Sequence, residues 1–202
     1  MSKVTPQTTT SGPWAITTER LAIAGVLAAI TIILGVVPGI GFFPVPNTTG
    51  NATTEHIPTI LGGVIGGPIV GIFSGLVFGL VSFLRATSPL FKDPLVAIVP
   101  RLFIGLVAWA VFAGLIRVRL NRDVAALIAG VLGSATNTVL VLGIAILRGY
   151  IQPVVVLTVL PQATVEAIVA AIITVILARV FYILQKRYVR APETKSREEL
   201  PY

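Results

Sequence analysis

Residues 54–85 read TEHIPTILGGVIGGPIVGIFSGLVFGLVSFLR, and this stretch organises the rest of the chain. It opens with Glu55 and His56, and no further ionisable residue follows until its last position. A ladder of glycines four residues apart runs through it: Gly63, Gly67, Gly71, Gly75 and Gly79. Positions four apart share one face of a helix, and a face without side chains lets a second helix approach closely in lipid. Pro68 lacks a backbone N–H and interrupts the ladder, so we expect two short helices joined at residues 66–68.

The composition is that of an integral membrane protein. Of the 202 residues, 55% are hydrophobic and 11% are charged, whereas about a quarter of a soluble domain is charged. We therefore expect an all-α integral membrane protein with six transmembrane helices in a compact bundle. The chain has no cysteine and a single histidine, His56. These counts exclude thiolate metal sites, cysteine nucleophiles and histidine metal clusters, so we expect no metal and no cofactor.

The net charge of +7 is carried mostly by basic residues that lie beside apolar segments. A basic chain can bind nucleic acid, but this placement is typical of membrane orientation, because cytoplasmic loops are rich in Lys and Arg. We therefore expect the chain to lie in the lipid bilayer and to bind no nucleic acid.

The apolar segments that can cross a membrane are residues 21–37, 57–84, 94–116, 124–147 and 161–184. The second is longer than the roughly 20 residues that one crossing needs. Its Gly-Gly-Pro break and the positive-inside rule both favour two short crossings. We then expect a six-helix domain over residues 17–188 in the cell membrane. The segments 1–16 and 189–202 are expected to be flexible and cytoplasmic.

Six crossings place the loops near residues 45, 90 and 152 outside, with several polar residues below them. Arg101 would lie roughly 10 Å below Pro94 at 1.5 Å per residue. Glu166 would lie at a similar depth below Pro161, with Gln162 on the same helix face. Charges inside a bilayer usually face a partner or a watery cavity, so we predict a polar substrate pocket open to the outside. Its candidate residues are Glu55, His56, Arg85, Lys92, Arg101, Asn137, Gln162 and Glu166.

These residues also have structural explanations that the sequence leaves open. Arg101 and Glu166 could pair with each other and lock the bundle. His56 could cap a helix end, and Asn137 could form a hydrogen bond between helices. The excess of Arg and Lys over acidic residues around the pocket predicts an anionic or partly anionic ligand. The scarcity of aromatic residues there argues against a stacked flat ring.

The sequence contains no group that would drive transport or catalysis. No GxxxxGK[ST] phosphate loop is present, so we expect no ATP hydrolysis. No Ser/His/Asp set is visible, so we expect no catalytic residue and no enzyme. The two halves show no obvious inverted repeat of the kind that many secondary transporters have. The pattern predicts a binding subunit that relies on the ATPase of another protein.

Three stretches resemble the substrate-binding S components of energy-coupling-factor (ECF) vitamin transporters. They are the residues 54–85 quoted above, the RATSPLFKDPL that follows, and Pro100-Arg101. The resemblance covers residues 21 to about 187. The family carries an AxxxA motif that docks on a transmembrane T component, and Ala24 and Ala28 stand at the matching positions. The resemblance implies that a T component and two cytoplasmic ATPases complete the transporter, and that the S component topples in the membrane to release the vitamin inside.

Within the family, the chain is most similar to the group annotated for pantothenate, an anionic and non-aromatic vitamin. In this scheme Arg101 would hold the carboxylate, while Asn137, Gln162 and Glu166 would bind hydroxyls and amide. The first loop and the loop between the third and fourth helices would gate the pocket. The alternatives are an S component for folate, cobalamin or riboflavin, an autonomous secondary carrier with Glu166 as its only deep carboxylate, or a membrane enzyme or purely structural protein.

Overall fold

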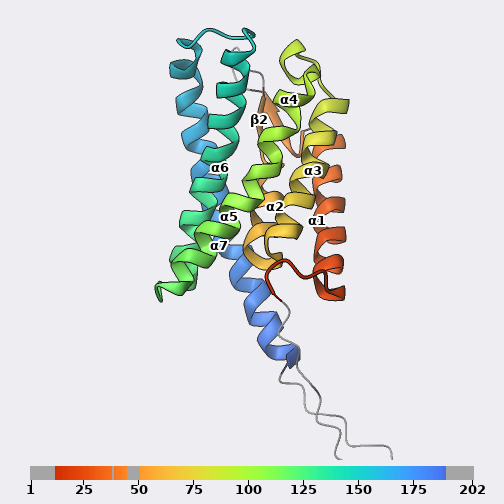
Figure 1. The fold of residues 1–202 in the computed structure, drawn as a ribbon, viewed down its shortest axis with the longest axis vertical. Coiled ribbons are helices and arrows are strands. Elements are labelled where there is room, and N and C mark those ends of the chain that lie inside the picture. Colours follow the sequence, from red (N-terminus) through yellow and green to blue (C-terminus); the bar gives the residue numbers. More distant parts are fainter. Residues whose placement is uncertain (1–11, 38, 45–50, 190–202) are drawn as a thin grey trace, which may run out of the picture.

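The computed structural model describes residues 12–37, 39–44 and 51–189 of the chain. The described residues form a bundle of helices with one short hairpin (Figure 1). The elements are α1 (Thr18–Val36), β1 (Phe42–Pro44), β2 (Asn51–Thr53), α2 (His56–Leu61), the π-helix η1 (Gly62–Gly66), α3 (Pro68–Leu84), the 3₁₀ helix η2 (Pro89–Lys92), α4 (Pro94–Ala97), α5 (Val99–Arg117), α6 (Arg122–Leu147) and α7 (Val155–Val189).

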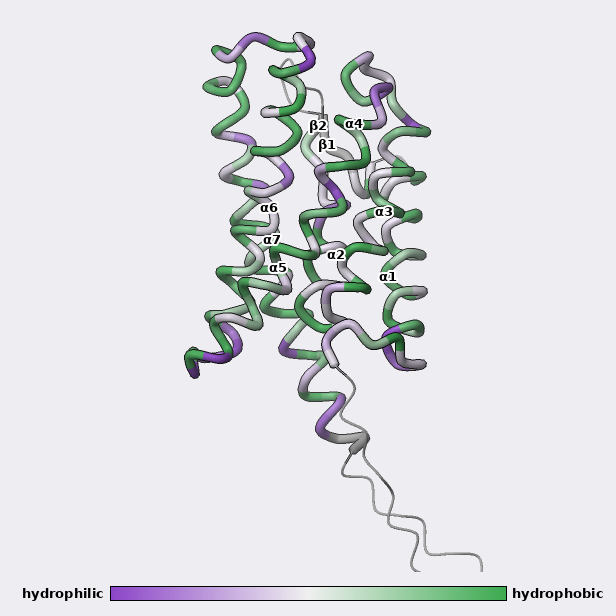
Figure 2. The backbone as a smooth tube through the Cα atoms, viewed as in Figure 1, coloured by the Kyte–Doolittle hydropathy of each residue, from purple (hydrophilic) through white to green (hydrophobic). Residues whose placement is uncertain are grey.

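The described residues contain four helical segments that are long and apolar enough to cross a membrane, and two shorter apolar ones. The four are Thr18–Val36, Pro94–Arg117, Arg122–Leu147 and Val155–Lys186, and the shorter two are His56–Gly66 and Pro68–Leu84. This all-helical arrangement is the one predicted, and its six segments are consistent with six crossings. Figure 2 shows hydrophilic residues gathered mainly at the two ends of the bundle. Most of the expected flexible segments, residues 1–11 and 190–202, lie outside the described residues.

The two ends of the bundle carry different connections. The β1–β2 hairpin, the α3–α4 connection and the α6–α7 connection lie at one end, which we call the hairpin end (Figure 1). The start of α1 and the ends of α5 and α7 lie at the opposite end. The hairpin was not predicted: its strands pair antiparallel, with Phe42 opposite Thr53, inside the segment expected to be a loop.

The last helix begins earlier than predicted. α7 starts at Val155 and carries Pro161 in its interior, so the expectation that this span begins at Pro161 is wrong. An internal proline removes one backbone hydrogen bond, but membrane helices tolerate this where neighbouring groups satisfy the freed carbonyl. Glu166 therefore lies roughly 16 Å from the start of its helix at 1.5 Å per residue, farther than the depth counted from Pro161.

The predicted break between two short helices is present at Gly67. Its φ angle of 91° lies in a region that L side chains rarely adopt, which explains why glycine stands there. The π-helix η1 precedes the break, and the Tyr182 hydroxyl donates to the Val64 carbonyl of η1 at 3.2 Å. A contact from α7 thus stabilises an irregular turn that propensity alone would not favour.

The other glycines of the ladder face α5. A Cβ at Gly71 would lie 2.8 Å from the carbonyl carbon of Gly105, and one at Gly79 would lie 2.9 Å from the Cα of Ile98. A Cβ at Gly75 would collide with the Arg101 carbonyl oxygen. Side-chain carbons do not approach backbone so closely, so the helices meet backbone to backbone. We call this contact the α3–α5 seam.

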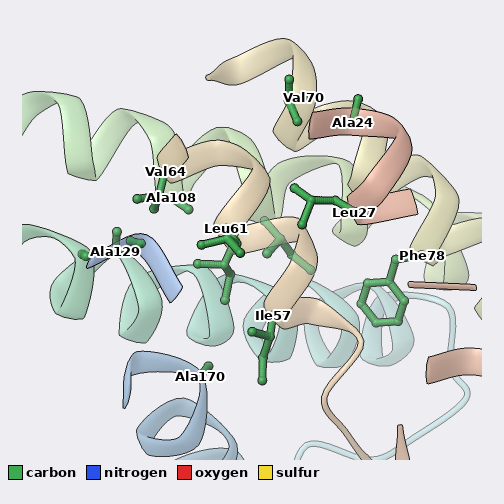
Figure 3. Packing of buried hydrophobic residues seen from close by; sticks show 14 residues of the cluster. Ala24, Leu27, Ile57, Leu61, Val64, Val70, Phe78, Ala108, Ala129 and Ala170 are labelled. Atoms are coloured by element: carbon green, nitrogen blue, oxygen red, sulfur yellow. The ribbon is translucent and has the colours of Figure 1, made fainter. Parts of the chain in front are cut away.

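The hydrophobic core lies where α1, α2, α3, α5, α6 and α7 meet. Figure 3 shows Ile57 and Leu61 of α2 surrounded by small and aliphatic residues of the neighbouring helices. α2 is buried along its whole length. Glu55 and His56, which begin this helix, are therefore held inside the bundle at the level where the polar cavity begins.

Candidate substrate-binding cavity

A polar cavity of about 60 Å³ lies at the hairpin end, between α5, α6, α7, β2 and η2. Its polar lining residues are Thr53, Arg101, Asn137, Thr138, Gln162 and Glu166, and its apolar lining residues are Phe91, Val141, Leu142 and Val159. Four of the predicted site residues, from three helices, therefore meet in one place. These four are Arg101, Asn137, Gln162 and Glu166.

Arg101 is buried with 3% of its surface exposed and forms no ion pair within 4.0 Å among the described residues. Its guanidinium carbon lies 5.1 Å from the ring centre of Phe78 and 5.0 Å from that of Phe91. One terminal nitrogen donates to the Val96 carbonyl at 2.6 Å, while Nε is buried with no partner. The predicted alternative of an Arg101–Glu166 ion pair is therefore not formed. Two rings hold the cation in place without neutralising it.

Glu166 on α7 is fixed by two neighbours. Its Oε1 accepts from the Thr53 backbone N–H and from the Gln162 side-chain amide, both at 2.9 Å. The second bond confirms that Gln162 and Glu166 share a helix face. The first connects α7 to the hairpin, because Thr53 ends β2.

Asn137 on α6 is buried, and its Oδ1 has no hydrogen-bond partner. Small residues of α6 place it at the cavity wall. A Cβ at Gly130 would lie 2.7 Å from the Cα of Ala171 on α7, and one at Gly133 would lie 2.7 Å from Ile60. The predicted alternative of a hydrogen bond through this oxygen to another helix is not formed, so Oδ1 is a buried acceptor without a partner.

Glu55 and His56 are buried beside the cavity but do not line it. Neither Glu55 oxygen accepts a hydrogen bond, and the carboxylate lies against Gly35 of α1, where a Cβ would collide with it. Neither His56 nitrogen makes a well-formed hydrogen bond, although the nearby Thr53 backbone interacts with this ring. His56 is the first residue of α2, and no side-chain cap is formed there.

Arg85 and Lys92 are exposed and do not line the cavity. The charged side chains of the wall are therefore one arginine and one glutamate, and the predicted excess of positive charge around the pocket is not found in its lining. One aromatic residue, Phe91, lines the cavity, and Phe78 contacts Arg101, so the predicted scarcity of aromatic residues does not extend to the surroundings of Arg101. Both rings come from residues far from Arg101 in sequence, so only the fold places them there.

At the hairpin end, Asp93 forms hydrogen bonds with Arg148 and Tyr150 that the sequence did not indicate. We call this cluster the clamp. Asp93 caps α4 by accepting from the Leu95 N–H at 2.9 Å, and it also accepts from Arg148 Nε at 2.8 Å and the Tyr150 hydroxyl at 3.2 Å. The bond from Leu95, followed by those from Arg148 and Tyr150, holds the pKa of Asp93 below its ordinary value. The same carboxylate raises the pKa of the Arg148 guanidinium. The clamp joins the residue before α4 to the α6–α7 connection.

A family model described as the substrate-specific component of ECF transporters matches residues 19–178. The chain belongs to this family. No curated protein matches the chain. Among solved structures, the chain is similar to the one described as "Structure and mechanism of the S component of a bacterial ECF transporter". The TM-score is 0.61 at 19% identity, over 83% of this chain and 98% of that one. The comparison supports the same fold, and the family makes this chain a multi-pass, substrate-binding membrane subunit.

The AxxxA positions of this S component lie beside an apolar groove at the end opposite the hairpin. Ala24 is buried against the core, and Ala28 is half-buried. The groove has a volume of about 340 Å³, and Ala24 lines it together with Arg20, Gly25, Val70 and Phe73. Leu21 is exposed and also lines the groove. Further large apolar residues of α1 are exposed elsewhere on the helix: Val26, Ile30, Ile32, Ile33 and Val36. Ala24 thus packs within the chain and also reaches a hollow in its surface.

Proposed function

We propose that this S component captures a water-soluble vitamin from outside the cell membrane, and that the vitamin is pantothenate. A transmembrane T component and two cytoplasmic ATPases would supply the energy for import. The hairpin end would face outward, with both termini in the cytoplasm. The chain itself would perform no catalysis. This orientation places the basic Arg117–Arg122 segment inside, as the positive-inside rule requires.

The proposal is carried by one observation: the buried guanidinium of Arg101 forms no ion pair among the described residues. A buried guanidinium without a carboxylate partner is costly in a membrane protein, and an unpartnered nitrogen at a cavity wall adds to that cost. The carboxylate of a ligand would supply both the charge and the acceptor. A carboxylate is the group that a guanidinium binds best, and pantothenate has one.

The rest of the cavity suits the other end of pantothenate. The free Asn137 Oδ1 and the Glu166 carboxylate accept hydrogen bonds, so they would bind the hydroxyls and the amide N–H of the vitamin. Phe91 and the aliphatic residues of α6 would contact its methyl groups. Glu55 and His56 would support Arg101 from behind, and Arg85 and Lys92 would attract the anion at the rim.

The ligand would have to enlarge the cavity. Its volume of about 60 Å³ is smaller than the roughly 300–1,000 Å³ of typical small-molecule sites. The smallest elements of its wall are β2 and η2, and each is carried by a connection rather than by a long helix. We therefore expect the hairpin and the α3–α4 connection to move when the vitamin enters.

Thermal unfolding of the detergent-purified S component against a panel of water-soluble vitamins tests the proposal. A ligand that binds only the folded state stabilises it by about 4 kcal/mol at a thousandfold excess over its dissociation constant. Pantothenate should raise the midpoint, and the other vitamins should not. A shift with another vitamin instead would mean that pantothenate is not the substrate, but the chain would still be a vitamin-binding subunit. No shift with any vitamin would contradict both the substrate and the vitamin-binding role.

A second experiment tests the T component as the partner. Ala28→Trp places a large ring on the small-residue face of α1, so we expect it to abolish uptake in cells that express the whole transporter. Pantothenate binding to the purified variant should remain, because Ala28 lies far from the cavity lining. Val26→Trp is the matched control, because Val26 is exposed on the face of α1 roughly opposite Ala24 and Ala28. Uptake that continues without any ATPase would support a secondary carrier instead.

A further inference from the structure

The charges of the cavity are arranged on opposite walls. Arg101 lies on α5 and Glu166 lies on α7, and α6 packs between these two helices. No ion pair connects the two side chains. A ligand that fills the cavity therefore meets a cation at one wall and a carboxylate at the other.

The Glu166 carboxylate is oriented for a hydrogen-bond donor. Both hydrogen bonds that it makes within the described residues end on Oε1. Its Oε2 has no such partner and is not sealed off from the cavity. Because Thr53 and Gln162 hold Oε1 in place, the second oxygen is a preorganised acceptor. Asn137, which lines the same cavity, adds an acceptor oxygen that is buried in this structure and would reach a ligand when the cavity widens.

A second carboxylate lies behind Arg101. Glu55 is buried, accepts no hydrogen bond and interacts with Arg101 through its charge, with a smaller contribution from the exposed Arg85. His56 is buried next to it and makes no ion pair within the described part of the chain. Arg101 nevertheless forms no ion pair with Glu55 or with Glu166. Among the described residues, no cation other than Arg101 lines the cavity, so none is there for a second negative charge on the ligand.

We propose that the cavity selects a ligand with a single negative charge at one end and a hydrogen-bond donor at the other, and that it rejects dianions. This inference rests on the proposed function, because it concerns the same cavity and the same ligand. The carboxylate of the ligand binds Arg101, and its hydroxyl or N–H group donates to Glu166 Oε2. A phosphate or second carboxylate at the far end would face Glu166 without a cation, and such like-charge contacts weaken binding.

Pantothenate and 4′-phosphopantothenate are suitable probes, because the phosphate replaces a donor hydroxyl at the end opposite the carboxylate. Isothermal titration of the purified wild-type S component should give affinity for the phosphorylated compound that is weaker by on the order of 100-fold. Glu166→Gln removes the repelling charge and weakens the acceptor. We expect it to reduce the ratio of the two dissociation constants, phosphorylated compound over pantothenate, by about tenfold. Glu19→Gln, on exposed α1 surface, is the matched control and should leave the ratio unchanged.

The outcomes separate this inference from the proposed function. If no vitamin binds the wild-type protein, the proposed function fails and the inference fails with it. If pantothenate binds and the phosphorylated compound binds equally well, only the inference fails; this comparison needs no variant. Binding of folate, which has two carboxylates, or of a vitamin without a carboxylate would also overturn it. A preference for biotin, a monoanion with N–H donors, would support the inference and replace the substrate.

Discussion

Helix α5 contributes to two different regions of the molecule. On the side of α3, Gly105 lies against Gly71, and the backbone at Arg101 lies against Gly75. On the side of the cavity, the Arg101 side chain lies between Phe78 and Phe91 and leaves its Nε without a partner. The seam is thus built from contacts between main chains, whereas the cavity is built from polar side chains that are only partly satisfied.

The difference shows how stability and binding are divided along one helix. Buried polar groups in native proteins almost always have partners, so the free atoms of Arg101 and Asn137 mark a region where stability is lower than it could be. The seam compensates by holding α5 close to α3, because close helix contact in lipid depends on packing rather than on the hydrophobic effect. We expect changes in the seam to alter folding and changes in the cavity to alter binding.

The largest effect is expected from Gly105→Leu. The new side chain would collide with the backbone of Gly71, which cannot move without separating α3 from α5. Overpacking of this kind destabilises by about 3 kcal/mol, so the midpoint of thermal unfolding in detergent should fall strongly. Leucine at Gly114, where a Cβ meets no atom within 4 Å, is the control. An unchanged midpoint for Gly105→Leu would mean that the helices do not meet so closely.

Unlike Gly105→Leu, Arg101→Gln should weaken ligand binding and leave the unfolding midpoint nearly unchanged. The hydrogen bond to a charged group contributes about 1.5–3 kcal/mol, so pantothenate affinity should fall roughly 10- to 100-fold in titration calorimetry. The unfolding midpoint without ligand should change little, because the lost ring and carbonyl contacts are offset by removing a buried charge that forms no ion pair. Arg117→Gln, at the other end of α5, should leave affinity unaltered. A variant that loses stability but keeps affinity would make Arg101 a structural residue.

Gly143→Ala tests whether every glycine in the bundle is needed for packing. A Cβ at this position of α6 meets no atom within 4 Å, and glycine inside a helix costs about 0.5–1 kcal/mol relative to alanine. The unfolding midpoint should therefore rise slightly. The same change at Gly71 should lower it. If both variants move in the same direction, the distinction between seam and open helix surface is wrong.

The smallest effect is expected at the rim, and only at acid pH. Because the folded state lowers the pKa of Asp93, its carboxylate stabilises the protein above the ordinary value of 3.8 and loses this contribution as pH falls through the lowered pKa. The midpoint of the wild type should therefore fall more steeply below about pH 4 than that of Asp93→Asn. Parallel pH profiles for the two proteins would exclude a role for the clamp in stability.

The predicted cavity residues show where sequence reasoning succeeds for a site. Arg101, Asn137, Gln162 and Glu166 were grouped because charges and amides are costly in lipid, and they do line one cavity. That rule identifies residues that must face inward. It does not say what they face, and so the ring contacts of Arg101 and the tether from Thr53 to Glu166 were missed.

The sequence by itself determined the features that depend on neighbouring residues. Hydropathy predicted the membrane segments, and Gly67-Pro68 predicted the break between α2 and α3, because backbone freedom and the missing proline N–H are local properties.

Only the tertiary structure decided which side chains share the cavity. The rotation of each helix about its axis depends on its packing against the others, so Glu55 and His56 are buried without lining the cavity, while Arg85 and Lys92 are exposed outside it. The length of α7 and the β1–β2 hairpin also depend on contacts far apart in sequence, such as that from Thr53 to Glu166. Hydropathy predicts which segments lie in the membrane, but the partners of a polar side chain are set by the three-dimensional packing.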